Sequence, residues 1–207
     1  MAIISNATTI ADAGAFSVSL GSMVHIKTLT ASSSATLSFV HGTADVVLDS
    51  TYPIYVFKFI NIHAGTDGSR FQFQTDTGTN TSYNITTTST VFVSHHRENG
   101  SDGALEYQSG DDQAQGTSFQ DLQAYGSNSA DDDHAESGTL TIYNPSSSTF
   151  VKHYIARTNY IDQNDYSIDS YVAGYFNTTT ALTRFQFKFT SGNIDAGKIK
   201  LYGIKDS

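Results

Sequence analysis

Acidic side chains gather in one part of the chain, from Glu98 to Glu136, which holds ten Asp and Glu residues and no Lys or Arg. Within it, the run DDDHAES places Asp131, Asp133 and Glu136 near one another, and carboxylate oxygens are ligands that Ca²⁺ prefers. The run lacks the EF-hand spacing with its central Gly and final Glu. We therefore expect a solvated acidic loop, with Asp131, Asp133 and Glu136 as candidates for a calcium site.

Histidine and serine residues do not form a recognisable catalytic pattern. The adjacent pair His95 and His96 ends an apolar run, and neighbouring strand residues point to opposite faces, so the two cannot easily share a metal. The spacings GxSxG, SxxK, HExxH and GxGxxG are missing, and the chain contains no Cys. Nothing fixes two acids at the separation that glycoside hydrolysis requires. We therefore expect a protein that is not an enzyme and has no cofactor.

Five tyrosines lie in or near stretches expected to be loops, namely Tyr107, Tyr125, Tyr160, Tyr166 and Tyr171. A Tyr ring offers a flat apolar surface with a polar tip, which suits the stacking of a sugar. Packing at the base of a loop explains the same residues equally directly. They are therefore candidates for a binding site, with structural packing as the alternative.

The composition limits the fold and the partners. The chain has 207 residues with sixteen Gly, two Pro, no Trp and abundant Tyr and Phe, which is typical of strands joined by polar turns. The formal net charge of −9 disfavours nucleic acid, because that affinity depends on Lys and Arg neutralising phosphates. No apolar run is long enough to predict a membrane span, and the start MAIISNATTIADAGAF does not resemble a signal peptide.

Alternating apolar and polar residues predict strands along most of the chain. Examples are RFQFQ at 70–74 and TRFQFKF at 183–189, and turn signals recur about every 8–12 residues. IYVFKFINI at 54–62 is apolar on both faces and predicts a central strand. The pattern predicts an all-β fold, an antiparallel β-sandwich of jelly-roll type with little or no helix. A short helix within 111–126 stays equally open.

The chain divides into an arm and a domain in this interpretation. Residues 1–20 are small, polar and weakly periodic, so we expect an N-terminal arm there. We expect residues 21–207 to form a single β-sandwich domain.

The last two expected strands each have one apolar face. Phe185, Phe187 and Phe189 alternate with polar residues, and so do Ile199 and Leu201, so each set points to one side of its strand. The connection SGNIDAG is typical of a long hairpin loop. We therefore expect these two strands to pair as a hairpin that ties the C-terminus into the core.

Six blocks follow one another within residues 24–204: IKTLTASSSATLSFV, LDSTYPIYVFKFINIH, NPSSSTFVKHY, FVKHYIARTN, VAGYFNTTTAL and SGNIDAGKIKLYGI. Together and in this order they resemble a family of virion structural proteins from tailed bacteriophages, especially marine ones. In that family they occur in a stand-alone protein or in the distal part of a fibre-like protein. The resemblance implies a particle component and supplies no catalytic residues. Its implied partners are other virion proteins, either the major capsid protein or tail proteins.

Three functions are compatible with these features. The first is a capsid decoration or cement protein, because the chain shows no heptad, collagen-like or β-helical stalk. The second is a receptor-binding domain of a tail fibre or spike that recognises host surface glycan through loops 98–136 and 160–168. The third, a polysaccharide-degrading enzyme, needs an acid pair among Asp131, Asp133 and Glu136. We expect the first, on the phage particle surface, as a homo-oligomer with a trimer as the candidate state.

Overall fold

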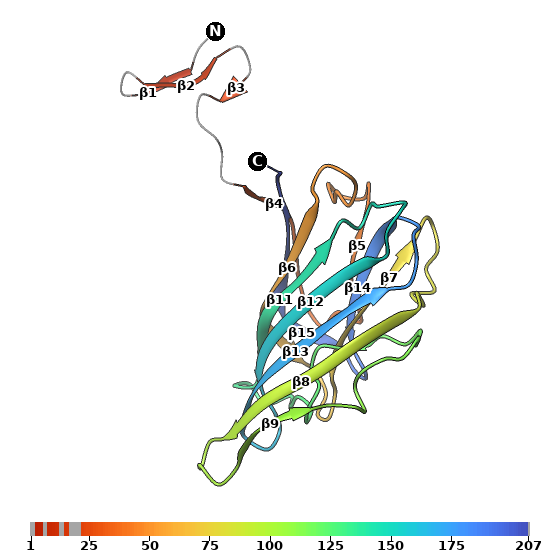
Figure 1. The fold of residues 1–207 in the computed structure, drawn as a ribbon. Helices are drawn as coiled ribbons and strands as arrows, with labels where there is room; N and C mark the ends of the chain where they lie inside the picture. Colours follow the sequence, from red (N-terminus) through yellow and green to blue (C-terminus); the bar gives the residue numbers. More distant parts are fainter. Residues whose placement is uncertain (1–2, 6–7, 13–14, 17–21, 207) are drawn as a thin grey trace.

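The computed structural model describes residues 3–5, 8–12, 15–16 and 22–206. These residues form fifteen β-strands and no helix (Figure 1). The strands are β1 (Ile3–Ser5), β2 (Thr8–Asp12), β3 (Ala15–Phe16), β4 (Met23–Thr30), β5 (Leu37–Val40), β6 (Ile54–Ala64), β7 (Phe71–Thr77), β8 (Thr87–Arg97), β9 (Gly103–Tyr107), β10 (Gln120–Asp121), β11 (Glu136–Tyr143), β12 (Lys152–Ile161), β13 (Tyr166–Phe176), β14 (Leu182–Phe189) and β15 (Ile194–Ile204).

The twelve strands from β4 onward form two antiparallel sheets. The smaller sheet has the order β10-β7-β14-β5, and the larger sheet has the order β4-β15-β6-β11-β12-β13-β8-β9. In Figure 1 the smaller sheet lies behind the larger one, as in a β-sandwich. Strand β6, which contains the stretch that is apolar on both faces, lies inside the larger sheet between β15 and β11. The predicted all-β class and the interior position of this strand are confirmed.

The chain crosses repeatedly between the two sheets. Successive strands β4, β5, β6 and β7 alternate between the larger and the smaller sheet, and repeated crossing of this kind is required in a jelly roll. A jelly roll has eight strands, whereas here β8, β9, β12 and β13 extend the larger sheet. The jelly-roll type therefore stays a prediction.

Strands β1 to β3 form a sheet of their own. β1 pairs with β2, and β2 pairs with β3. Their sheet includes none of the later strands, and Figure 1 shows it apart from the sandwich. The arm expected over residues 1–20 contains these strands, and its residues 1–2, 6–7, 13–14 and 17–20 lie outside the described residues.

The core between the sheets is rich in phenylalanine, and Phe187 of β14 lies at its centre. The centre of the Phe187 ring is 5.1 to 6.3 Å from the ring centres of Phe39, Phe57, Phe59, Phe71 and Phe73. Phe185 and Phe189 are also buried, so the predicted inward face of this strand is confirmed. Each buried Phe side chain stabilises the fold by about 1.5–3 kcal/mol.

The last two strands do not form the predicted hairpin. β14 pairs with β7 and β5 in the smaller sheet, whereas β15 pairs with β6 and β4 in the larger one. Ile199 and Leu201 are fully buried, as expected, but their strand belongs to the larger sheet and not to the sheet of β14. The prediction was wrong because alternation identifies the apolar side of a strand without showing whether its neighbour lies beside it or opposite it.

The helix left open within 111–126 is not formed. This stretch contains only the short strand β10 and irregular turns. Gly116 exchanges two backbone hydrogen bonds with Thr87 at the start of β8, at 2.7 and 2.9 Å. Its amide and carbonyl groups are therefore bonded to a distant part of the chain and not within a helix. In the part of the chain that the structure describes, there is no helix long and apolar enough to span a membrane.

Candidate functional site

Much of the acidic segment (residues 98–136) packs onto the sandwich. Leu122 is fully buried, and the Thr158 hydroxyl of β12 donates a 2.8 Å hydrogen bond to the Leu122 carbonyl. The Tyr160 hydroxyl, also from β12, donates to the Tyr125 carbonyl at 2.6 Å and accepts from the Tyr125 amide at 3.1 Å. The acidic segment therefore covers inward-facing side chains of the larger sheet.

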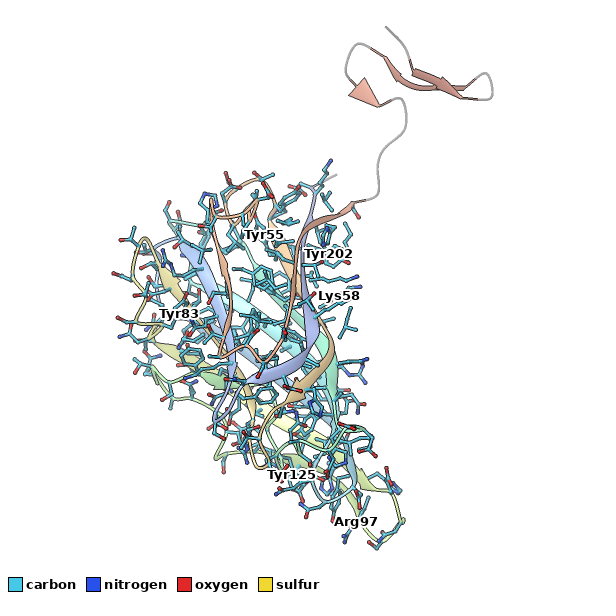
Figure 2. All side chains as sticks on the ribbon, turned by 180° about the vertical axis from the view of Figure 1, so that it is seen from behind. Tyr55, Lys58, Tyr83, Arg97, Tyr125 and Tyr202 are labelled. Atoms are coloured by element: carbon cyan, nitrogen blue, oxygen red, sulfur yellow. The ribbon has the colours of Figure 1, made fainter. Side chains whose placement is uncertain are left out.

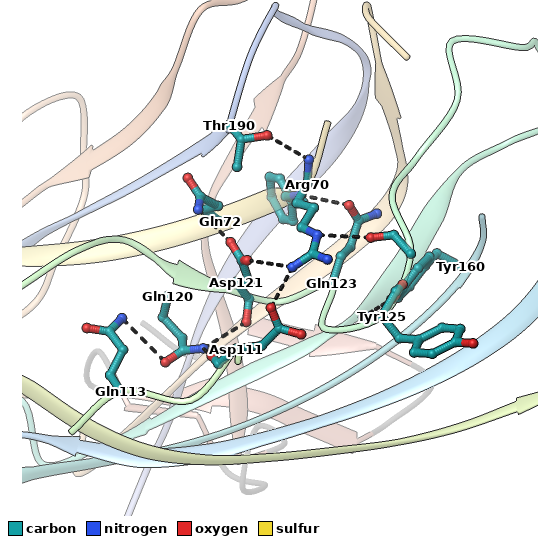
Figure 3. A network of polar contacts seen from close by, with 12 residues as sticks. Arg70, Gln72, Asp111, Gln113, Gln120, Asp121, Gln123, Tyr125, Tyr160 and Thr190 are labelled. Atoms are coloured by element: carbon teal, nitrogen blue, oxygen red, sulfur yellow. Dashed lines mark hydrogen bonds and ion pairs between the residues drawn. The ribbon is translucent and has the colours of Figure 1, made fainter. Parts of the chain in front are cut away.

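Arg70, which precedes β7, fastens this segment through a network of polar contacts (Figure 3). Its Nη1 lies 2.5 Å from Oδ1 of Asp111 and 3.3 Å from Oδ2 of Asp121, and its Nε donates to the Gly126 carbonyl at 2.9 Å. Burial raises the pKa of Asp111 and of Asp121, although the positive charge of Arg70 acts in the opposite direction. One guanidinium thus holds three separate points of the acidic segment.

The three carboxylates considered for calcium are not brought together. Asp131 accepts a 2.8 Å hydrogen bond from the Ser129 hydroxyl, the Asp133 side chain is 86% exposed, and Glu136 is fully buried. Among the described residues, no group of three or more His, Asp or Glu is arranged to hold a metal ion. The expectation of a solvated loop is wrong for Glu136, because this residue begins β11 and faces the interior.

The Glu136 carboxyl has an unusual environment. Its neighbours in the register are Ile62 of β6 and Tyr160 of β12, and neither carboxyl oxygen has a hydrogen-bond partner among the described residues. Burial raises the pKa of Glu136 well above 4.5, and the nearby polar groups of Thr158 and Gln123 offset this effect only in part. Glu136 therefore keeps its proton at pH values where an ordinary Glu has lost it.

The candidate tyrosines have different locations. Tyr160 is a core residue, and Tyr107 lies exposed on the edge strand β9. Tyr125 and Tyr166 do come together, with ring centres 6.3 Å apart, and both lie against His95 of β8. The His95 ring stacks on Tyr125 at 4.5 Å. Two of the residues proposed from the sequence thus share one location, and His95 is a third aromatic partner that the sequence did not reveal.

A hollow of about 320 Å³ opens beside these rings, and we call it the tip hollow. Its lining residues are Arg97, Tyr125, Gly126, Asp162, Asn164 and Tyr166. Figure 2 shows Arg97 and Tyr125 at one end of the molecule, far from Tyr55 and Tyr202. The Arg97 guanidinium lies 5.4 Å from the centre of the Tyr166 ring. An aromatic wall beside polar groups of both charges is suited to binding a polar ligand with an apolar face.

Loops from different parts of the chain meet at the tip hollow. The Glu98 amide donates to the Asp165 carbonyl at 3.0 Å, and the Gln163 amide donates to the Ser127 carbonyl at 3.0 Å. The Tyr166 hydroxyl lies 3.0 Å from Oδ2 of Asp102, and this hydrogen bond raises the Tyr166 pKa. The structure thus brings the loops expected to read a receptor, 98–136 and 160–168, into contact.

The outer face of the larger sheet carries a second group of aromatic and charged side chains. Tyr171, which lies on β13 and not in a loop, stacks on Phe92 of β8 with ring centres 4.6 Å apart. The Arg157 guanidinium lies 4.9 Å from the Tyr171 ring centre, and its Nη2 is 2.7 Å from Oδ2 of Asp169. The hydrogen bond from Arg157 lowers the pKa of Asp169. No sequence pattern connects these residues, because they come from separate strands.

Two hollows lie on this outer face. The first, of about 460 Å³, is lined mainly by apolar and aromatic side chains that include Tyr143, Ile155 and Tyr175. The second, of about 410 Å³, is lined by polar side chains that include Asn159 and Asp169. Both lie over β11, β12 and β13, so apolar and polar surfaces adjoin along the same strands.

Comparisons of the chain with protein-family models, with curated proteins and with solved structures gave no match. The described residues define an all-β protein whose twelve strands from β4 onward form two antiparallel sheets, consistent with a β-sandwich. Its candidate binding surfaces are the tip hollow and the outer face of the larger sheet.

Proposed function

We propose that this protein is a non-enzymatic structural protein of a phage particle and serves as a capsid decoration or cement protein on its outside. The sequence blocks that resemble virion structural proteins lie on β4, β5, β6, β12, β13 and β15. All of these except β5 belong to the larger sheet. The resemblance therefore applies to the framework of the sandwich more than to the acidic segment.

The observation that carries this proposal is the separate sheet β1–β3. Among the described residues these strands pair only with one another, so backbone groups along the two outer strands are free to pair with another chain. The segment after β3 leads to β4, an edge strand of the larger sheet. A small sheet joined to the sandwich in this way is suited to attach one subunit to a neighbour. The partners in this proposal are further copies of the chain and the major capsid protein.

Imaging of intact virions by electron cryomicroscopy tests the location. We expect density of the size of this sandwich on the outer surface of the capsid. Density or antibody label confined to the tail would contradict the proposal.

An attachment assay tests the role of the N-terminal sheet. Full-length protein is added to particles from which it has been removed, beside a variant that lacks residues 1–20 and a control that lacks residues 206–207. We expect the arm-deleted variant to lose attachment while its circular dichroism spectrum stays that of a β-sandwich, and the control to attach normally. Normal attachment without residues 1–20 would refute the tether.

A second function, a tail fibre or spike domain that recognises host surface glycan, is favoured by the tip hollow. There Tyr125, Tyr166 and Arg97 line one concave surface at the meeting point of three loops. Binding of the purified protein to host envelopes tests it. Tyr166→Ala is expected to weaken binding, and Phe150→Ala, which removes an exposed ring that lines none of the hollows described above, is expected to leave it unchanged. Equal binding by both variants would exclude this site.

A further inference from the structure

A row of cationic and aromatic side chains crosses the outer face of the larger sheet. Residues on neighbouring strands lie directly opposite one another from β15 through β6, β11, β12 and β13 to β8. The members of this cationic row are Lys200, Lys58, Thr139, Arg157, Tyr171 and Phe92. At about 4.8 Å between neighbouring strands, the row is roughly 24 Å long.

The lysine end of the row contains an unfavourable pair. Lys58 and Lys200 are direct cross-strand partners, and like charges in that position destabilise a sheet. Neither has an ion-pair partner in the described part of the chain. Lys198 projects from the same face two residues away, and the Lys58 ammonium lies 5.8 Å from the Tyr202 ring centre (Figure 2). A bound anion would remove the repulsion at this end.

The aromatic end of the row is held in place by stacking. The rings of Tyr171 and Phe92 are within 5° of parallel, and Phe92 is 42% exposed. Arg157 bonds both carboxylate oxygens of Asp169 through Nε and Nη2, so its guanidinium keeps one orientation over the Tyr171 ring. Side-chain freedom is already limited before any ligand binds, which lowers the entropy cost of binding.

The order of groups along the row indicates the class of ligand. A polymer that carries anionic groups on a chain of sugar rings meets ammonium groups at Lys58 and Lys200 and the exposed ring of Phe92. Nucleic acid fits less well, because phosphate recognition depends on many Lys and Arg contacts and the chain as a whole carries −9.

We propose that the cationic row binds an anionic glycan, a polysaccharide bearing carboxylate or sulfate groups. Its acidic groups contact Lys58 and Lys200, its hydroxyls bond Arg157 and Asp169, and one sugar ring stacks on Phe92, whose own stacking partner Tyr171 holds it in place. The site is separate from the tip hollow and does not depend on where on the particle the protein sits.

Calorimetric titration of the full chain tests this proposal. The probes are an alginate oligosaccharide, dextran sulfate and neutral dextran, in a buffer of about 0.15 M ionic strength, where charges are screened beyond roughly 8 Å. We expect binding to at least one acidic polymer and none to neutral dextran. The double variant Lys58→Gln/Lys200→Gln is expected to bind about tenfold more weakly, which corresponds to ~1.4 kcal/mol. Tyr171→Ala is also expected to weaken binding.

A matched variant and a stability measurement make the result specific. Lys188→Gln/Lys205→Gln removes two positive charges elsewhere, Lys188 being on the smaller sheet over the Phe119 ring, and is expected to bind as the unchanged protein does. The Lys58→Gln/Lys200→Gln variant should unfold no more easily than the unchanged protein, because it loses a repulsive pair.

Three results would overturn the proposal. They are failure to bind either acidic polymer, equal weakening in the two double variants, and tighter binding to duplex DNA than to both acidic glycans.

Discussion

Replacement of Glu136 by Gln isolates the effect of one buried carboxyl on stability. Gln has the same shape as protonated Glu but cannot ionise, so the core packing around residue 136 is kept. Glu136 is fully buried, its oxygens have no hydrogen-bond partner among the described residues, and burial raises its pKa well above 4.5. In the unfolded chain this burial is lost, and the pKa returns to the ordinary value.

The sign and size of the pH effect follow from this difference. Because the folded pKa is raised, the folded protein holds a proton that the unfolded chain releases as the pH rises above about 4.5. The contribution of Glu136 to stability is therefore largest below the unfolded pKa and is lost as the pH rises toward the folded pKa. Within that window the loss is about 1.4 kcal/mol per pH unit. The Gln variant lacks this loss.

Urea denaturation at a series of pH values measures the effect. The free energy of unfolding of Glu136→Gln minus that of the unchanged protein should increase by about 1.4 kcal/mol per pH unit above pH ~4.5 and then level off. Glu106→Gln, at a side chain that is 47% exposed, controls for the loss of one surface carboxylate. A difference that is independent of pH would refute the reasoning, because it would show that Glu136 titrates alike in the folded and unfolded chains.

Three further substitutions test the packing that holds the candidate surfaces. Phe187→Ala, in the fully buried centre of the core, is expected to cost about 3–5 kcal/mol in chemical denaturation; a loss below ~1 kcal/mol would contradict this placement. Gly138→Ala puts a Cβ in collision with the Arg157 carbonyl oxygen of the neighbouring strand, so we expect a loss of about 1–3 kcal/mol in the same assay; an unchanged stability would show that β11 and β12 do not approach this closely. Arg70→Gln leaves Asp111 and Asp121 without their cation. It should cost ~2 kcal/mol and speed limited proteolysis within residues 98–136, and an unchanged cleavage rate would argue against the anchor.

The sequence predicted those features that depend on local alternation. The inward face of Phe185, Phe187 and Phe189 and the interior position of the strand at 54–62 follow from which residues are apolar, and the structure confirms both. The pairing of the last strand was not predictable in the same way. Two strands that each have one apolar side bury it equally well as neighbours in one sheet or in two sheets that pack together. The sequence is compatible with both arrangements, and the predicted hairpin was the wrong one.

The contacts and burial of the site residues were also not predictable from local sequence. The ring chemistry that makes Tyr125 and Tyr166 candidates is visible in the sequence, but the contact with His95 depends on how the acidic segment folds over the sheet. Glu136 was expected in water because it ends a run of acids, and only the register with β6 and β12 turns it inward. Side-chain chemistry is therefore readable from the sequence, whereas the burial that changes it requires the pairing of distant strands.

The salt dependence of glycan binding follows from the distribution of charge over the larger sheet. Residues 98–136 carry ten acids, and part of this segment packs on the inner face of β12, whereas the cationic row lies on the outer face. At about 0.15 M ionic strength the screening length is roughly 8 Å, less than the ~10 Å spacing of packed sheets, so the row acts as a positive surface. At 0.01 M the length grows to roughly 30 Å, and the net charge of −9 then repels an anionic glycan. Titrations over this range should therefore show weaker binding at both the lowest and the highest salt. A steady rise in affinity down to 0.01 M would show that the acidic segment does not act on this face.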